Sequence, residues 1–323
     1  MTPPADQALV VIPCLNEKAH LEGVLAAMLA DPHARHCRIV VCDGGSTDAS
    51  RDIVARHPQV TLLDNPRRLQ SAAVNLAAET FGDGCAWLIR VDAHADYPPA
   101  FLGRLIETAK ATGAQSVVTS MTSRGVDCFQ RAVAAAQNSK LGTGGSAHRS
   151  AGAGGWVDHG HHALFDMRAF RAVGGYNAAF THNEDAELDV RLNASGARIW
   201  LAGDLPIGYY PRRTPGALFR QYINHGAGRA RTVMLHRTRL KLRQWAPAMI
   251  APAALAALLA PWFWPVALPA ALWAGASLGY GLLLGLKARD PCACMAGVPA
   301  MIAHLGWSIG FWRQRLFGSA SAP

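Results

Sequence analysis

The feature that most constrains the fold is a short apolar segment that stops at a cluster of polar residues. Trp87 to Val91 has the length and composition of a buried strand. Asp92, His94 and Asp96 follow it, and Pro98-Pro99 prevents the strand from continuing. Open α/β sheets bind ligands where their strands end. Asp92 and His94 would suit a divalent cation that holds a diphosphate, although an acidic turn capping the next helix remains the alternative.

The preceding residues repeat a pattern of strand, polar turn and helix. The apolar strand segments are Ala8–Ile12, Ile39–Cys42 and Val60–Leu63. Glu17 follows the first strand and Asp43 follows the second, while Asn16 and Ser46 are placed to cap the next helices. Four strands alternating with three helices predict an α/β domain with a mostly parallel, Rossmann-like sheet. The fingerprint G-x-G-x-x-G is absent from the first turn, which counts against an NAD enzyme.

One segment accounts for the net charge of +9 in this chain of 323 residues. Arg212 to Trp245 contains nine basic residues and no acidic one, so the rest of the chain is balanced. Such a segment suits nucleic acid, anionic lipid or a polyphosphate. Phe219 and Tyr222 are the aromatic residues within it before Trp245, too few for stacking on bases. A non-catalytic nucleic-acid or membrane binder is an alternative class, but it leaves the acidic turns unexplained.

A long uncharged segment follows the basic one. No charged residue occurs from Ala246 to Leu286, which at about 20 residues per crossing predicts two membrane helices with a turn near Pro261–Pro265. Pro291–Trp312 is a third, weaker candidate. Basic residues before the first helix and after the second favour the cytoplasm, but those after the third do not fit this orientation. Whether the third segment spans is therefore left open, and a buried hairpin in a soluble core is the alternative.

The spacing of the cysteines and histidines does not predict a further metal site. The seven cysteines have no repeated spacing, which predicts a reducing compartment without a disulfide framework. Cys292 and Cys294 lack a second pair for zinc. Asp158, His159, His161 and His162 resemble a metal cluster. However, His159 and His161 alternate along an expected strand and His162 faces the other way, so we expect imidazoles lining a pocket, with a zinc site as the alternative. No cleavable signal peptide is visible at the polar N-terminus.

Four motifs in order give the chain a family resemblance. They are V-I-P-C-L-N-E, V-C-D-G-G-S-T-D, R-V-D-A-H and N-E-D-A-E-L-D. Together they resemble glycosyltransferase family 2, which has the GT-A fold, over about residues 7 to 235, and within it the ExoA-type proteins of succinoglycan and related exopolysaccharide synthesis. The resemblance implies a GT-A catalytic domain, which we place at 1–211. The charge and hydropathy patterns predict a basic interface segment at 212–245 and a membrane anchor at 246–323 with two to three transmembrane helices.

The resemblance also implies how a donor would bind. In the family, the first two turns hold the uridine of a UDP-sugar, and a D-x-D motif binds the diphosphate through Mn²⁺ or Mg²⁺. Here His94 replaces the second Asp of that motif, so the implied metal ligands are Asp92 and His94; imidazole is a competent ligand for Mn²⁺. The full set expected at the donor is Pro13, Glu17, Asp43, Arg68, Asp92, Arg229 and Arg231.

For the acceptor, the resemblance implies a base at the start of a later helix. The Asp of the family's E-D pair removes the acceptor proton, which assigns Asp185, next to Glu184; acidic residues that favour a helix N-terminus are the structural alternative. On the acceptor side we expect His148, in a Gly- and Ser-rich stretch suited to ordering over substrate, with Gln221 and His225. Gln221, His225 and Arg229 share one helical face. The Q-x-x-R-W signature of processive synthases is missing.

These observations predict a metal-dependent, inverting glycosyltransferase in the bacterial inner membrane, with a cytoplasmic catalytic domain. It would transfer a hexose, with glucose as first candidate, from a UDP-sugar to a polyprenyl-diphosphate-linked saccharide. Transfer directly to polyprenyl phosphate is the alternative within enzymes. Membrane lipid is an expected partner and nucleic acid is not.

Overall fold

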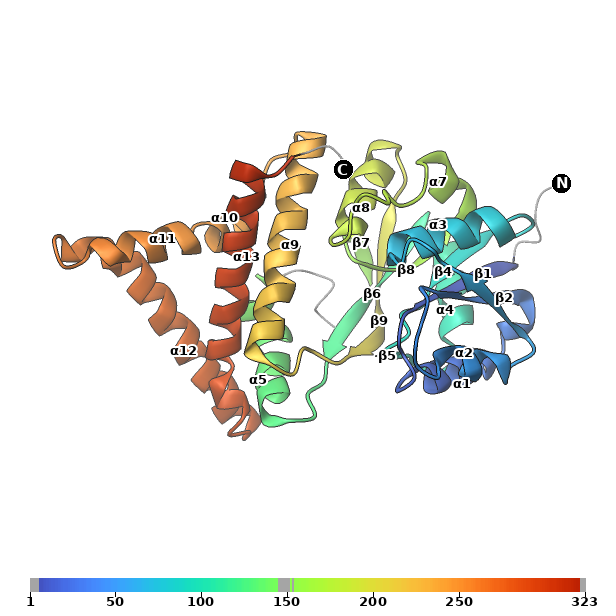
Figure 1. Cartoon of the computed structure of the whole chain (residues 1–323), viewed down its shortest axis with the longest axis horizontal. Coiled ribbons are helices and arrows are strands. Elements are labelled where there is room, and N and C mark those ends of the chain that lie inside the picture. The colour runs from blue at the N-terminus through green and yellow to red at the C-terminus, as the bar shows by residue number, and fades with distance from the viewer. Residues whose placement is uncertain (1–5, 145–151, 153, 320–323) are drawn as a thin grey trace. The chain divides into compact units, whose positions relative to one another are not determined.

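The computed structural model describes residues 6–144, 152 and 154–319 (Figure 1). The chain divides into two compact units, Met1–Met121 with Ser150–Tyr209, and Thr122–Arg149 with Tyr210–Pro323. Residues 122–149 therefore group with the C-terminal segment, whereas the sequence placed them in the catalytic domain.

The first unit is built on one mixed sheet. Among the described residues its strand order is β3-β2-β1-β4-β8-β6-β9-β5, with β7 paired to β9. The strands are β1 Ala8–Cys14, β2 Cys37–Asp43, β3 Val60–Asp64, β4 Trp87–Arg90, β5 Ala95–Asp96, β6 Ser116–Ser123, β7 Gly155–Val157, β8 His161–Asp166 and β9 Ile199–Tyr209. The four strands foreseen before residue 92 pair in parallel, and the later ones pair antiparallel.

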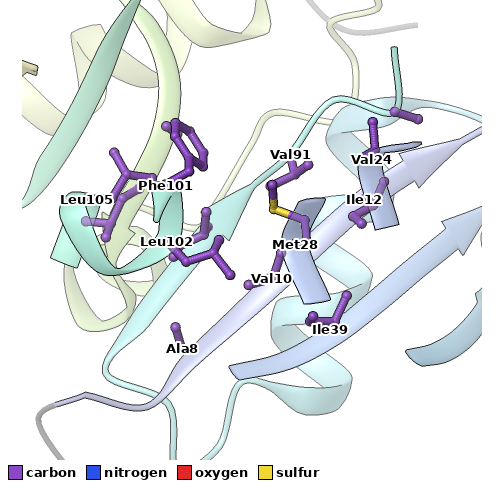
Figure 2. Close-up of a cluster of buried hydrophobic side chains, with 14 of the residues drawn as sticks. Ala8, Val10, Ile12, Val24, Met28, Ile39, Val91, Phe101, Leu102 and Leu105 are labelled. Atoms are coloured by element: carbon purple, nitrogen blue, oxygen red, sulfur yellow. The ribbon is translucent and has the colours of Figure 1, made fainter. Parts of the chain in front are cut away.

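Helices cover both faces of this sheet, which confirms the predicted α/β fold. They are α1 Leu21–Leu29, η1 Ala34–His36, α2 Ser50–Ala55, α3 Gln70–Phe81, α4 Phe101–Thr112, α7 Met167–Ala172 and α8 Glu184–Ala194. Successive side chains of β1 point to opposite faces of the sheet and so pack with different helices. Val10 and Ile12 pack with α1 and α4 in the core of Figure 2. Leu9 and Val11 pack with α3 and α8 on the opposite face.

The turns after β1 and β2 are joined to each other, which corrects two predictions. The Asn16 amide donates to Ser46 Oγ at 2.9 Å, and the Thr47 amide donates to Asn16 Oδ1 at 2.8 Å. Neither Asn16 nor Ser46 caps a helix, because α1 begins at Leu21 and α2 at Ser50. The polar side chains instead hold two strand-end turns together.

The second unit is helical. Its elements are α5 Cys128–Gln137, α6 Lys140–Thr143, α9 Pro215–His236, α10 Leu242–Ala248, α11 Ile250–Ala256, η3 Ala257–Leu259, η4 Trp264–Ala267, α12 Leu268–Ala288, η5 Ala293–Met295 and α13 Gly297–Phe317. Within the described residues, three segments are long and apolar enough to cross a membrane: Leu242–Leu259, Trp264–Ala288 and Ala293–Phe317. They match the two predicted membrane helices and the weaker third candidate.

A disulfide in the second unit overturns the expectation of reduced cysteines only. Cys128 at the start of α5 is bonded to Cys292, 164 residues later in the turn after α12. The ion pair between Arg131 Nη2 and Asp290 Oδ1, at 2.8 Å, joins the same two segments. Packing of α5 on that turn brings the two sulfurs together, and nothing in the spacing of the cysteines indicates this contact.

Candidate active site

The centre of the site is a buried arginine at the end of β4. Side chains alternate along the strand, so Arg90 shares a face with Leu88, which packs against α8. The Arg90 side chain is 4 % exposed, and a charge so deeply buried is stable only beside opposite charges. Its Nη1 lies 2.7 Å from Asp185 Oδ1, and its Nε lies 3.2 Å from Asp92 Oδ1. One guanidinium therefore connects the carboxylate after β4 with the carboxylate at the start of α8.

Asp92 is held as an anion by several donors. Gln70 Nε2 donates to Oδ1 at 2.7 Å, and His161 Nε2 lies 3.2 Å from Oδ2. The pairing of β4 with β8 explains the histidine, since continuing the register from Ile89 and Leu164 places His161 opposite Asp92. Burial acts to raise the pKa of Asp92, but the Arg90 charge and the His161 contact hold it far below its usual range. Asp92 is therefore ionised at any physiological pH.

The two acids at the start of α8 have different environments. Asp185 Oδ1 accepts from Arg90 Nη1 and from the Tyr176 hydroxyl, at 2.7 and 2.9 Å, so the orientation of this carboxylate is fixed. Its Oδ2 lies 3.8 Å from His161 Nδ1. Glu184 is 9 % exposed and lies 3.7 Å from Arg90. Burial, together with the Asp185 charge, raises the pKa of Glu184 to about 7.

The turns after the parallel strands complete the same edge of the sheet. Glu17 Oε1 lies 2.9 Å from His94 Nδ1, which joins the turn after β1 to the one after β4. Asp43, at the end of β2, accepts from the Ser46 amide and pairs with Arg51 at 2.8 Å. Burial acts to raise the pKa of Asp43, but these hydrogen bonds lower it below the ordinary value. The carboxylates predicted for the donor thus end on one edge.

Comparisons with known proteins show which family the chain belongs to. The family model for Glycosyl transferase family 2 matches residues 9–174. The succinoglycan biosynthesis protein ExoA of Rhizobium meliloti (strain 1021) is 49 % identical over 313 residues, which cover 96 % of this chain and 95 % of that protein. The chain belongs to glycosyltransferase family 2.

Solved structures show the same GT-A fold. The mannosyltransferase PcManGT from Pyrobaculum calidifontis, in complex with GDP-Man and Mn²⁺, superposes with a TM-score of 0.57 at 21 % identity, covering 94 % of this chain and 86 % of that one. GalNAc-T7 with UDP, GalNAc and Mn²⁺ gives a TM-score of 0.52 at 12 % identity, covering 76 % and 50 %. At 21 % and 12 % sequence identity, the similarity to these two structures shows the fold alone.

The other donor residues expected from the family motifs divide between the two units. Pro13 lies within β1, opposite Cys42 of β2. Arg68 follows β3 with a left-handed backbone (φ 56°), and a methyl group on Gly45 would lie 3.4 Å from its Nη2, so the guanidinium lies over that turn. Arg229 and Arg231 are half-buried on α9, in the second unit. Their roles at the diphosphate stay predictions.

The acceptor residues also stay predictions. Gln221, His225 and Arg229 share one face of the continuous helix α9, as their fourfold spacing indicates. The His225 ring lies 5.5 Å from that of Tyr222. His148 lies outside the described residues.

Four residues of the site were not foreseen: Gln70, Arg90, Tyr97 and Tyr176. Arg90 had a sequence signal, because it is the charged residue within the apolar segment Trp87–Val91 and so requires carboxylate partners. Tyr97 accepts from the Asp92 amide at 2.6 Å, and Tyr176 donates to Asp185. His161 lies beside Asp92, at 3.2 Å from its Oδ2, and the pocket expected at these imidazoles stays a prediction. His159, expected on the same strand, lies before β8 and contacts Asp189 at 2.5 Å.

The family's metal can be tested against the donor set. A carboxylate offers about four lone-pair positions. Asp92 Oδ1 accepts from Arg90 and Gln70, and Oδ2 contacts His161, which among the described residues leaves one position of Oδ2 open. No group of three or more potential ligands occurs in the part of the chain that the structure describes. An ionised Asp92 with the half-exposed His94 fits a cation whose other ligands are phosphate oxygens and water.

Proposed function

We propose that this family 2 glycosyltransferase transfers a hexose, with glucose as first candidate, from a UDP-sugar to a polyprenyl-diphosphate-linked saccharide, with inversion at the anomeric carbon. Its place is exopolysaccharide synthesis at the bacterial inner membrane, with the catalytic unit in the cytoplasm. The name of the 49 % identical relative, succinoglycan biosynthesis protein ExoA, supports the pathway. The candidate membrane helices support an acceptor carried by lipid.

The observation that carries the proposal is the pairing of Asp92 and Asp185 through Arg90. A single displacement needs stabilisation of the leaving diphosphate and a base for the acceptor hydroxyl. Asp92 stands at the strand edge that carries Glu17 and Asp43, so we assign it to the donor. Asp185 comes from α8, on a different element, and Arg90 fixes the separation of the two carboxylates.

Asp185 is the residue we assign as the base. Its Oδ1 accepts from Arg90 and Tyr176, which orients the group, and we assign the proton transfer to Oδ2. Attack by one acceptor oxygen in one step inverts the configuration, so an α-linked UDP-sugar gives a β-glycoside. Glu184, with its pKa raised to about 7, is the second candidate for the base.

A divalent cation, Mn²⁺ or Mg²⁺, held by Asp92 and His94, would neutralise charge on the departing diphosphate. The low pKa of Asp92 supports this role, since the carboxylate needs no deprotonation to bind. Glu17 holds the His94 ring through Nδ1 and so restricts its orientation.

Transfer directly to polyprenyl phosphate is the second candidate. The two reactions differ in product, because a sugar phosphate ester is far more acid-labile than a glycosidic bond. Membranes containing the full-length protein would be incubated with labelled UDP-hexoses, and with GDP-mannose as a control donor. An acid-stable lipid-linked product that requires a lipid-linked saccharide supports the proposal. An acid-labile product formed with polyprenyl phosphate alone favours the second candidate, and transfer from GDP-mannose alone contradicts the donor.

A further inference from the structure

The three apolar segments of the second unit are not equivalent. In the first two, 11 % of the most apolar stretch is buried inside the protein, whereas in the third, which contains α13, the share is 50 %. Where α11 and η3 meet α12, the most exposed apolar side chains are Leu255, Leu258, Trp262, Trp264 and Leu272. Figure 1 shows α11 and α12 diverging from α13 as the two arms of a hairpin.

α13 packs against α9, which is too basic to lie in the hydrocarbon core of a membrane. α13 packs along α9, and the contacts run in the same direction on both helices: a Cβ on Gly306 would lie 2.9 Å from Phe219 O, and one on Gly310 would lie 2.0 Å from Ile223 O. α9 carries three arginines, at positions 220, 229 and 231, and it is not among the candidate spans. If α13 crossed the bilayer, it would take these arginines with it.

Most positions at the turn of the hairpin either lack an amide hydrogen or bond it within the turn, as a lipid environment favours. Pro261 and Pro265 have no N–H group. The amides of Trp262 and Phe263 both donate to Leu259 O, at 3.0 Å, and Val266 donates to Phe263 O at 3.3 Å. Unbonded amides are very costly in hydrocarbon, where no water can replace the partner. No charged residue is found from Ala246 to Leu286.

The first arm of the hairpin leaves α13 at a defined point. Pro252 lacks the amide that would bond to Ala248 O within a helix. Ser308 Oγ and Trp312 Nε1 of α13 donate to this carbonyl instead, at 2.7 and 2.8 Å. Beyond this point, α11 has seven residues and η3 has three, a length of about 16 Å.

The second arm contacts α13 from Trp273 onward, where Trp273 Nε1 donates to His304 Nδ1 at 3.3 Å. A Cβ on Gly281 of α12 would lie 2.2 Å from the Gly297 amide nitrogen, so α12 contacts the start of α13 there. From its beginning at Leu268 to Trp273, α12 extends for about 8 Å before the first of these contacts. Both free arms are shorter than the hydrocarbon core of about 30 Å.

We propose that the membrane anchor is a re-entrant hairpin, formed by α11, η3 and α12, whose tip at Trp262–Trp264 stays inside the bilayer, while α13 lies beside α9 at the membrane surface. Both ends of the chain are then on the side of the catalytic unit. Arg313 and Arg315, the basic residues near the end of the third segment, then lie on the cytoplasmic side. They no longer conflict with the orientation that the other basic residues favour. Trp312 and Phe311 pack with Leu240, so the end of α13 joins the basic segment that precedes the hairpin. The proposal concerns topology and does not depend on the donor or acceptor.

The sidedness of the C-terminus is the first test. Full-length protein would carry, after Pro323, either a fluorescent protein that folds only in the cytoplasm or an alkaline phosphatase that is active only outside. An N-terminal fusion of each reporter marks the side of the catalytic unit. We expect both ends to give the same result. Phosphatase activity at the C-terminus, with none at the N-terminus, would mean an odd number of crossings and would overturn the proposal.

The position of the tip is the second test. The test uses two cysteine substitutions, Phe263→Cys at the tip and Leu316→Cys at the end of α13. These residues are similarly exposed in the parent chain, at 61 % and 65 %, so they form a matched pair. Each variant would be treated with a membrane-impermeant maleimide, and labelling of the parent chain gives the background. In intact cells we expect neither new cysteine to react. In opened membranes without detergent we expect Leu316→Cys alone to react, and detergent should expose Phe263→Cys. Labelling of Phe263→Cys in intact cells would show a crossing hairpin, and its labelling in opened membranes without detergent would show a hairpin outside the bilayer; either result overturns the proposal.

Discussion

Replacing Arg90 tests whether a buried guanidinium holds the active site together. Arg90→Met keeps most of the side-chain volume but leaves Asp92, Asp185 and Glu184 without their shared cation. Breaking a buried ion pair by removing one partner costs about 3–5 kcal/mol of the free energy of unfolding. At about 2–4 °C per kcal/mol for a domain of this size, the melting temperature of the catalytic unit should fall by roughly 6–20 °C.

The chain offers a matched control with the same geometry and different burial. Arg104 Nη2 lies 2.7 Å from Asp204 Oδ2, the distance that also separates Arg90 from Asp185. The Arg104 side chain is 38 % exposed and that of Asp204 is 67 % exposed. Surface pairs of this kind contribute about 0–1 kcal/mol. Arg104→Met should therefore change the melting temperature by at most about 4 °C.

The assay is thermal unfolding of the detergent-solubilised full chain, followed across a pH series. The Arg90 charge lowers the pKa of Asp92, so the stability it gives is fully present above the ordinary Asp pKa of 3.8 and is lost as pH falls below it. The difference between parent and Arg90→Met should accordingly shrink in acid. Arg90→Lys, which keeps the charge, should recover part of the loss. Equal effects of Arg90→Met and Arg104→Met at neutral pH would refute the reasoning.

Two further predictions concern the neighbouring groups. Burial raises the pKa of Glu184 from 4.5 to about 7. Ionisation of Glu184 therefore destabilises the folded state increasingly as the pH rises between these two values. Glu184→Gln should raise the free energy of unfolding by up to about 3 kcal/mol at pH 8 relative to its effect at pH 4. A pH-independent effect in unfolding experiments would contradict the assigned pKa. EDTA should abolish sugar transfer, and Mn²⁺ or Mg²⁺ should restore it. The variant His94→Asp should remain active with a changed metal preference. Full activity in the exhaustively chelated enzyme would contradict the metal assignment.

The strands could be predicted because each is a compact apolar run closed by a turn. Their polar ends could be predicted as one edge because parallel strands end together, and Glu17, Asp43 and Asp92 do meet there. The capping roles given to Asn16 and Ser46 were wrong for a physical reason. A side-chain oxygen at a strand end can serve any nearby amide, and the sequence does not reveal that the two turns lie close enough to bond to each other.

The contacts that were missed join residues far apart in the chain. Arg90 and Asp185 are separated by 95 residues, and Cys128 and Cys292 by 164. An arginine inside an apolar strand does indicate that carboxylates must be near, but it does not identify which ones. In the same way, composition alone made α13 a candidate span, and only its packing along α9 distinguishes it from the hairpin.

The proposed mechanism assigns Asp185 as the base, while Asp92 and its neighbours serve the donor. The most direct measurement compares Asp185→Asn with the parent protein in turnover and in equilibrium binding of the UDP-sugar. The amide keeps the size of the side chain and removes its basicity. We predict unchanged donor affinity and a turnover lower by roughly 10²-fold or more. Near-normal turnover would move the role to Glu184, and equal losses of binding and turnover would make Asp185 a donor ligand or a structural residue.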